Sequence, residues 1–214
     1  MRGLRGSQVL IRLLVAVFQG ILCSDRFSAY LKYHQGQAQF CWAHLKRNLL
    51  GIVEFTKSSA VERFCRDALA QHARLFRLWH KFRVGQIDRS QLIRRSIPIQ
   101  KRIVELAERH LDSQHREVRN LATALFEYNE RLFTFLEQEG VEPTNNSAER
   151  ALRTGVQWRK ICFGTRSAAG EMATARLLTV AETCDLQQLN TLAYLVAAIT
   201  CYRCCQPVTS LLPR

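Results

Sequence analysis

The sequence contains no long uninterrupted run of apolar residues. Its most apolar stretch near the start, Val9 to Phe18, is interrupted by Arg12 and is shorter than the about 20 residues that a membrane-spanning helix needs. Basic residues precede this stretch and Cys23 follows it, which is the order of a signal or lipoprotein leader. Leu22 is too large for the usual residue before a cleavage site. We therefore predict no membrane span, and keep an exported helical protein as an alternative.

Acidic side chains are also scarce. The chain of 214 residues has 18 Asp and Glu against 31 Lys and Arg, for a formal net charge of +13. A hydrophobic fraction of 47% is too high for a disordered protein. So strong a positive charge attracts polyanions, chiefly nucleic acid or an anionic membrane. We expect a folded protein with a polyanionic partner.

The sequence lacks the loop-rich, cysteine-dense frame of a disulfide scaffold. Several of its eight cysteines lie within apolar helical stripes, a pattern that favours reduced, buried thiols and a cytoplasmic protein. Cys41-x-x-His44 and Cys201-x-x-Cys204 have the ligand types and spacing of a structural zinc site. That zinc site stays open as an alternative.

Apolar periodicity predicts a mainly helical chain with two short strands near its start. A helix over 9–18 is followed by a strand at 21–23, which ends just before Asp25, and Phe27 and Tyr30 then lie on a helix face. A second strand is predicted over 37–42. The strongest helical stripe covers 58–82, and further helices are predicted over 92–111, interrupted or started near Pro98, and over 118–136, 172–184 and 189–199.

Two acidic residues stand out, each with an ordinary structural interpretation. Glu149 follows Asn146 by three residues, which is the spacing of a helix capping box, and it precedes Arg153 by four. Asp25 alone is typical of a turn or helix-cap aspartate. Local spacing by itself therefore favours structural roles for both.

Four segments, taken in order, change this interpretation. The first is Ser24 to Tyr30, in which an Asp precedes a Tyr by five residues, and the second is Cys41 to Arg47, with the pattern Cys-x-Ala-His. The third is Pro143 to Arg153, and the fourth combines Arg159-Lys160, Phe163-Gly164 and Gly170-Glu171. Together they resemble motifs of the insertion sequence 66 transposase family, whose catalytic triad contains the Asp of the first segment and the Glu of the third.

The resemblance implies a metal-dependent DNA transposase of the DDE type with an RNase H-like fold. The fold class would be α/β but mainly helical, a partial RNase H-like domain that lacks its N-terminal strands and carries an inserted helical block. Residues 1–48 would form part of this core with the second acidic residue, 49–139 the helical insertion, and 140–214 the C-terminal part of the core.

The implied chemistry explains why carboxylates are required. DNA cleavage and strand transfer are displacements at phosphorus that two divalent ions can assist, and Mg²⁺ prefers carboxylate oxygen. The resemblance makes Asp25 and Glu149 catalytic metal ligands for Mg²⁺ or Mn²⁺, with Tyr30, Cys41, His44, Asn145 and Asn146 supporting the motifs. The family's first catalytic Asp has no counterpart, because no Asp or Glu precedes Asp25. We expect a truncated chain that is inactive by itself.

DNA is the partner that the resemblance implies, both as transposon ends and as target, with a homo-oligomer as a further expectation. Candidate phosphate contacts are Lys46, Arg47, Arg150, Arg153, Arg159, Lys160 and Arg166, with Trp158 available for base stacking. Other basic residues, including Arg94, Arg95, Lys101 and Arg102, are interpreted in part as solvated helix faces. We predict a nucleoid-associated cytoplasmic protein. The alternative is a non-catalytic, basic DNA-binding or interaction protein.

Overall fold

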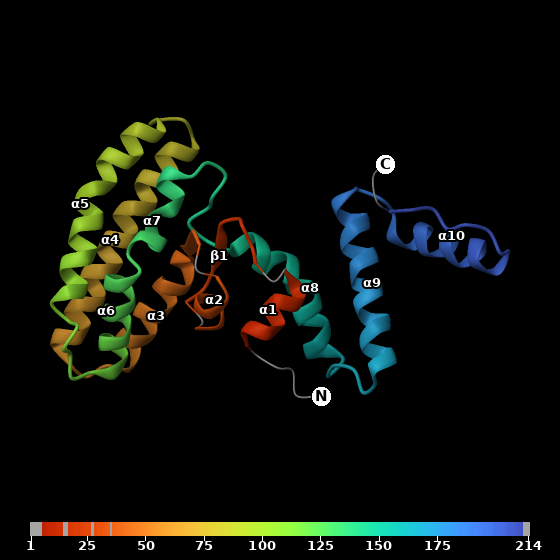
Figure 1. The fold of residues 1–214 in the computed structure, drawn as a ribbon, viewed down its shortest axis with the longest axis horizontal. Coiled ribbons are helices and arrows are strands. Elements are labelled where there is room, and N and C mark those ends of the chain that lie inside the picture. Colours follow the sequence, from red (N-terminus) through yellow and green to blue (C-terminus); the bar gives the residue numbers. More distant parts are fainter. Residues whose placement is uncertain (1–5, 15–16, 27, 35, 212–214) are drawn as a thin grey trace. The chain divides into compact units, whose positions relative to one another are not determined.

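The structure is a computed structural model that describes residues 6–14, 17–26, 28–34 and 36–211. Phe27, for which a helix face was predicted, lies outside these ranges. The chain divides into two compact units, Met1–Asn146 and Ser147–Arg214. Both are mainly helical, as predicted, and the two strands described lie in the first unit (Figure 1).

The first unit begins with a short βαβ arrangement. Strand β1 (Leu22–Ser24) pairs in parallel with β2 (Ala38–Phe40), with Leu22 opposite Ala38, and α2 (Ser28–Tyr33) connects the two strands. Helix α1 (Ser7–Leu13) precedes them. The prediction of a helix as far as Phe18 was wrong, because Leu14 already has non-helical backbone angles, φ −101° and ψ −94°.

Strand β2 is fixed to helix α7 (Glu130–Glu137) by buried side chains that bond to backbone atoms. The Gln39 amide nitrogen donates to Leu132 O at 3.1 Å, and its amide oxygen accepts from the Phe135 N–H at 2.8 Å. The Thr134 hydroxyl donates to Ala38 O at 2.7 Å. These bonds satisfy polar groups of both elements, so the small sheet does not depend on its own ladder alone.

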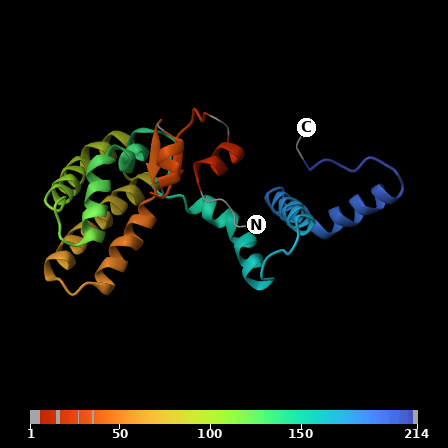
Figure 2. The same cartoon turned by 60° about the horizontal axis from the view of Figure 1, so that its bottom comes forward.

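A helical block makes up most of the first unit. It comprises α3 (Trp42–Phe55), α4 (Ser59–Arg83), α5 (Arg89–Glu108), α6 (Arg116–Glu127) and α7. Helices α4 and α5 form a long hairpin (Figures 1 and 2). Asp88 caps α5, where its carboxylate accepts from Gln91 N at 2.7 Å and the Gln91 side chain accepts from Asp88 N.

Three predictions about this block were inaccurate. Helix α3 was not predicted. Pro98 does not interrupt α5. Because proline has no N–H, the carbonyl of Arg94 lacks its usual helical partner, but Arg94 and Pro98 are both on the exposed side of the helix, where solvent is available to this carbonyl. The stripe predicted as one helix over 118–136 is two helices, because Tyr128 and Asn129 form a turn between α6 and α7.

One continuous core joins the strands to the helical block. Trp42 is 1% exposed, and its indole N–H donates to Leu132 O at 2.7 Å. The apolar stripe predicted for α4 is confirmed, since Phe64, Cys65 and Leu75 are buried. Other large buried side chains come from β2, α3, α5 and α7: Phe40, Leu49, Leu92, Ile99, Leu132, Phe135 and Leu136.

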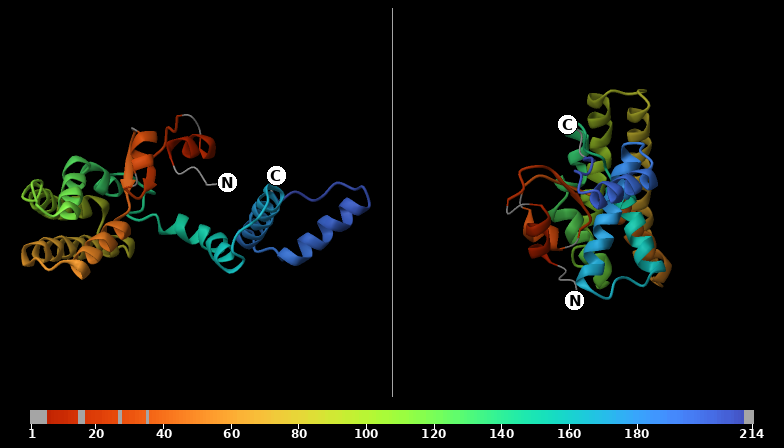
Figure 3. Two further views of the ribbon diagram at one scale, coloured as in Figure 1. Left: turned by 90° about the horizontal axis from the view of Figure 1, so that it is seen from below. Right: turned by 90° about the vertical axis from the view of Figure 1, so that its right-hand side faces the viewer.

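The second unit consists of α8 (Asn146–Ile161), α9 (Ala168–Leu186) and α10 (Thr191–Arg203), which follow one another along the chain (Figure 3). Helix α8 begins at the last residue of the first unit. The closing helices were predicted within a few residues of these bounds. Among the described residues of this unit, Cys184 alone is buried.

Candidate functional site

Asp25 directly follows β1, at the carboxyl end of a parallel strand. The Ser24 hydroxyl donates to Asp25 O at 2.9 Å, and the Asp25 side chain is half-buried. The neighbouring strand β2 ends at the same edge and leads directly into Cys41. Carboxyl ends of parallel strands are where open α/β sheets place their functional groups. The strand end predicted for Asp25 is therefore confirmed.

Two neighbouring side chains, Arg26 and Tyr30, interact electrostatically with the Asp25 carboxylate. Burial lowers the pKa of the Arg26 guanidinium, and the negative charge of Asp25 opposes this shift. Burial, and secondarily the charge of Asp25, raise the pKa of the Tyr30 phenol. The Asp-to-Tyr spacing seen in the sequence thus brings Tyr30 within electrostatic reach of Asp25, and Arg26 provides a nearby positive charge.

The Cys41 to Arg47 segment starts α3 beside this strand end. The Cys41 N–H donates to Ser24 O at 2.8 Å, and the Cys41 thiol is buried. The His44 ring Nε2 lies 3.1 Å from Arg47 Nη2. His44 is half-buried rather than part of the core, whereas Lys46 and Arg47 are exposed. The two basic residues are therefore accessible to an external partner.

The segment before α8 meets the Cys41 segment across more than one hundred residues of sequence. The Trp42 N–H donates to Pro143 O at 3.0 Å, and the Asn145 N–H donates to Cys41 Sγ at 3.4 Å. The Asn145 side-chain oxygen is buried and accepts no hydrogen bond from any residue that the structure describes. Three of the four motif segments therefore meet at the carboxyl edge of the sheet.

Glu149 lies in the first turn of α8 and is half-buried. Because α8 begins at Asn146, Glu149 is its fourth residue, so the predicted capping box with Asn146 as N-cap does not match these bounds. Asp25 belongs to the first unit and Glu149 to the second. Of the basic residues predicted to contact phosphates, Arg150, Arg153, Arg159, Lys160 and Arg166 are exposed, while Trp158 is half-buried.

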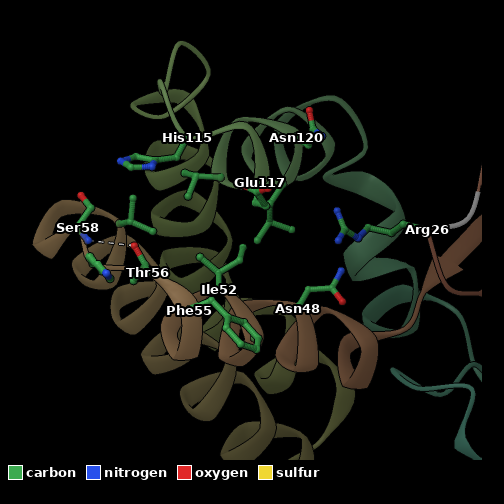
Figure 4. A pocket seen from close by; sticks show the side chains of 14 residues that line it. Arg26, Asn48, Ile52, Phe55, Thr56, Ser58, His115, Glu117 and Asn120 are labelled. Atoms are coloured by element: carbon green, nitrogen blue, oxygen red, sulfur yellow. Dashed lines mark hydrogen bonds between the residues drawn. The ribbon is translucent and has the colours of Figure 1, made fainter.

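A cavity of about 950 Å³ opens beside Arg26. Figure 4 shows Arg26 and Asn48 at one end and Ser58 and His115 at the other, with Ile52 and Phe55 between them. With its amide oriented to satisfy both neighbours, Asn48 donates to His44 O at 3.1 Å and accepts from Arg26 Nη2 at 2.6 Å. Asn48 therefore links the Asp25 and His44 segments.

Sequence reasoning missed the roles of Arg26, Asn48 and Trp42. Arg26 adjoins Asp25 within the Ser24 to Tyr30 motif, and Asn48 follows His44 by four residues, which is one helical turn. A helix recognised at Trp42–Phe55 would have placed His44 and Asn48 side by side. Nothing in the local pattern indicates that Trp42 contacts α7.

Each of the two predicted metal ligands carries donor atoms suited to a hard divalent cation. Asp25 and Glu149 offer carboxylate oxygens, which Mg²⁺ and Mn²⁺ prefer over sulfur or nitrogen. Within the described ranges, no three His, Cys, Asp or Glu side chains come together as metal ligands. Cys41 and His44 lie in the first unit, and Cys201 and Cys204 in the second.

All eight cysteines are free thiols, as predicted, although only Cys41, Cys65 and Cys184 are buried. The prediction of burial was therefore wrong for the exposed thiols Cys23, Cys162, Cys204 and Cys205. None of the helices that the structure describes is long and apolar enough to span a membrane.

Comparisons with known proteins agree with the motif resemblance. A family model described as Transposase IS66 family matches residues 1–173, a range that includes both Asp25 and Glu149. An uncharacterized protein of Sinorhizobium fredii, y4qI, is 27% identical over 210 residues, which is 92% of this chain and 38% of that protein. This chain thus spans well under half the length of that relative. No solved structure matches the chain.

Proposed function

This chain belongs to the IS66 family of transposases, and we propose that it contributes two metal-binding carboxylates, Asp25 and Glu149, to a DNA cleavage and strand-transfer site. The observation that carries the proposal is the meeting of three motif segments at one edge of the sheet. The Cys41 N–H donates to Ser24 O at 2.8 Å, and the Asn145 N–H donates to the Cys41 side-chain Sγ at 3.4 Å. Asp25 follows Ser24 directly.

The side chains around Asp25 have distinct roles in this proposal. Arg26 and Tyr30 interact electrostatically with the Asp25 carboxylate, and metal binding uses the deprotonated carboxylate. Divalent ions bound there would activate the attacking hydroxyl and neutralise the leaving oxygen. Lys46, Arg47 and the exposed basic residues of α8 would contact DNA phosphates.

We also propose that the sheet belongs to a larger, RNase H-like sheet. Leu22 N bonds to Gln37 O and Ser24 O accepts from Cys41 N, so these two residues of β1 face β2. Strand alternation then directs the N–H and C=O of Cys23, which is exposed, away from β2. That edge of β1 is able to pair with a further strand.

Residues 1–24 contain no Asp or Glu, so they supply no first acidic residue of a DDE triad. We expect that the purified chain neither nicks nor joins DNA with Mg²⁺ or Mn²⁺. The assay is conversion of supercoiled to nicked plasmid. Nicking that Asp25→Asn or Glu149→Gln abolishes would overturn the expected inactivity while supporting the metal site.

Metal binding provides a test that does not depend on activity. The full chain is titrated with Mn²⁺, and the free ion is followed by electron paramagnetic resonance. Asp25→Asn and Glu149→Gln should each weaken binding by about tenfold or more, since even the loss of an outer hydrogen-bond partner costs 10–100-fold at metal sites. Asp112→Asn, at an exposed carboxylate far along the sequence from both, is the matched control. Equal effects of all three variants would overturn the ligand assignment.

A non-catalytic DNA-binding protein is the second candidate function. The net charge of +13 and the exposed basic residues favour it, and it requires no carboxylate. The Mn²⁺ titration separates the two functions. A chain that binds duplex DNA, but whose Mn²⁺ affinity is unaffected by Asp25→Asn and Glu149→Gln, would fit the second.

A further inference from the structure

The α4–α5 hairpin carries a small groove in which four of the six lining residues are cationic. Its volume is about 240 Å³, and Arg74, Arg77, Leu78 and Lys81 of α4 line it together with Arg95 and Ile99 of α5. We call Arg74, Arg77, Lys81 and Arg95 the basic groove. No acidic residue lines it, and among the described residues none of these four cations forms an ion pair.

The same interhelix seam is neutralised elsewhere along its length. Arg102 of α5 lies 3.7 Å from Asp67 of α4, which matches opposite charges across the seam. Arg74 lies seven residues after Asp67 on α4, and Arg95 lies seven residues before Arg102 on α5. Both line the groove. Two helical turns from an attractive pair, the seam therefore places two positive charges together.

The cations continue along the exposed face of α4. Arg63, Arg66, Arg74, Arg77 and Lys81 are all exposed, and together with Ala70 they are spaced by three or four residues. This spacing places them on one side of the helix. Lys81 lies eighteen positions after Arg63, a distance of about 27 Å at 1.5 Å per residue. Within the part of the chain that the structure describes, Arg66 alone among these cations forms an ion pair, with Glu62 at 2.6 Å.

Clustered like charges weaken a folded protein unless an external anion neutralises them. A single phosphate would need only the small groove, whereas a row of cations about 27 Å long matches an extended polyanion. Duplex DNA presents one negative charge per about 1.7 Å of its axis. We propose that the α4 face and the basic groove bind the phosphate backbone of duplex DNA. The choice of DNA as the polyanion rests on the proposed function.

The binding mode follows from the side chains. The groove combines guanidinium and ammonium groups with the apolar Leu78 and Ile99, and no Asn or Gln lines it. Phosphate contacts of this kind position DNA without reading its sequence. Binding through this surface is therefore strongly dependent on salt and weakly dependent on sequence.

The test compares two double variants of the full chain that remove the same charge. Arg77→Gln with Arg95→Gln alters the groove, whereas Arg94→Gln with Lys101→Gln alters exposed cations of α5 outside the groove lining. Binding to a fluorescent 30-base-pair duplex is measured by anisotropy over a range of salt concentrations. The groove variant should make the slope of log affinity against log salt shallower by about two, or about one per phosphate contact. The control should change it by less than half as much.

The outcomes separate this inference from the proposed function. If the wild-type chain binds duplex DNA and both double variants weaken binding equally, the groove assignment is overturned and the DNA partnership stands. If the wild-type chain does not bind duplex DNA, the groove assignment and the DNA partnership are both overturned. A clear preference for duplex RNA that depends on Arg77 and Arg95 overturns DNA as the occupant.

Circular dichroism and thermal denaturation of both variants check their folding. Arg77 and Arg95 are exposed and make no hydrogen bond with any described residue, so removing their charges should leave the midpoint unchanged or slightly higher. Should the groove variant unfold, Arg77→Lys with Arg95→Lys retains the charges. The slope of log affinity against log salt for this Lys variant must then equal the wild-type slope, and a shallower slope overturns the inference.

Discussion

Helix α4 in the first unit and helix α9 in the second differ in how they use apolar residues. Helix α4 concentrates them on one face, and seven of its residues are buried. Helix α9 is the more apolar of the two, yet it distributes these residues around its circumference and buries only Cys184. Apolar content alone therefore does not make a core. The arrangement of apolar residues on the helix decides whether neighbouring elements can cover them.

The same contrast extends to whole units. The first unit packs α3 to α7 around one continuous core, whereas exposed apolar side chains in the second include Phe163, Leu186 and Leu192 at 96%, 84% and 72%. Helices that are apolar all round are stable when other elements surround them. The second unit does not surround its own helices, so its stability is expected to depend far less on individual apolar contacts.

Matched leucine truncations give the largest expected difference between the units. Leu75 in α4 is 0% exposed and Leu177 in α9 is 55% exposed, and both lie inside long helices. Leu75→Ala should lower the free energy of unfolding by about 2–5 kcal/mol through lost burial and a residual cavity. Leu177→Ala should change it by about 0.5 kcal/mol or less. Urea denaturation followed by circular dichroism measures both. Equal losses would show that α9 is packed in solution.

The buried amide of Gln39 tests whether polar contacts also hold the first unit together. Gln39→Leu removes the bonds to Leu132 O and Phe135 N. Leu132 O keeps its bond from the Trp42 indole N–H, so the expected cost is that of the lost buried bonds, about 1–3 kcal/mol. Gln37→Leu, at an exposed side chain before the same strand, is the control. The variants are compared by urea denaturation. A neutral Gln39→Leu would mean that β2 does not need α7.

A buried histidine makes the first unit sensitive to acid. Burial, and secondarily the positive charge of Lys46, lower the pKa of His72 to about 4 from its usual 6.5. The ring stacks on Phe76 with 4.3 Å between centroids. Because the folded state favours the neutral ring, its stabilising contribution is complete above pH 6.5 and is lost as the pH falls towards 4.

Between pH 7 and pH 5 this loss should amount to about 2 kcal/mol. His72→Phe keeps a ring beside Phe76 and has no titrating group, so its stability should decline less over the same interval. Urea denaturation at several pH values measures the difference. Parallel decline of the two proteins would place the acid sensitivity elsewhere in the chain.

How much of the fold the sequence predicts depends on whether the information is local. Helix α4 follows from a one-sided stripe at helical spacing, and Asp25 was placed at a strand end because a short apolar run precedes it. Helix α3 was missed because adjacent apolar pairs such as Leu49-Leu50 and Ile52-Val53 obscure the period. Pro98 was misleading because only the tertiary structure shows that its face of α5 is exposed.

The candidate site follows the same rule. Its residues were identified by their motifs, and Tyr30 and Asp25 lie close because α2 begins just after β1. The contacts from Asn145 to Cys41 and from Pro143 to Trp42 join residues about one hundred positions apart. No local spacing encodes such contacts, because they arise when α7 packs against β2 and returns the chain to the sheet edge.

The smallest expected effect lies in the turn between α8 and α9. Phe163 has φ 55° and a side chain that is 96% exposed, so a bulky residue adopts a left-handed conformation without burial to offset its strain. Asn adopts this conformation more readily, and Phe163→Asn should stabilise the turn by about 1 kcal/mol or less. Cys162→Asn, at the preceding exposed residue, is the control and should bring no gain. Thermal denaturation followed by circular dichroism measures both variants. A loss of stability in Phe163→Asn alone would mean that the Phe163 side chain is covered in solution. The second unit would then bury more apolar surface than the exposed fractions of its side chains indicate.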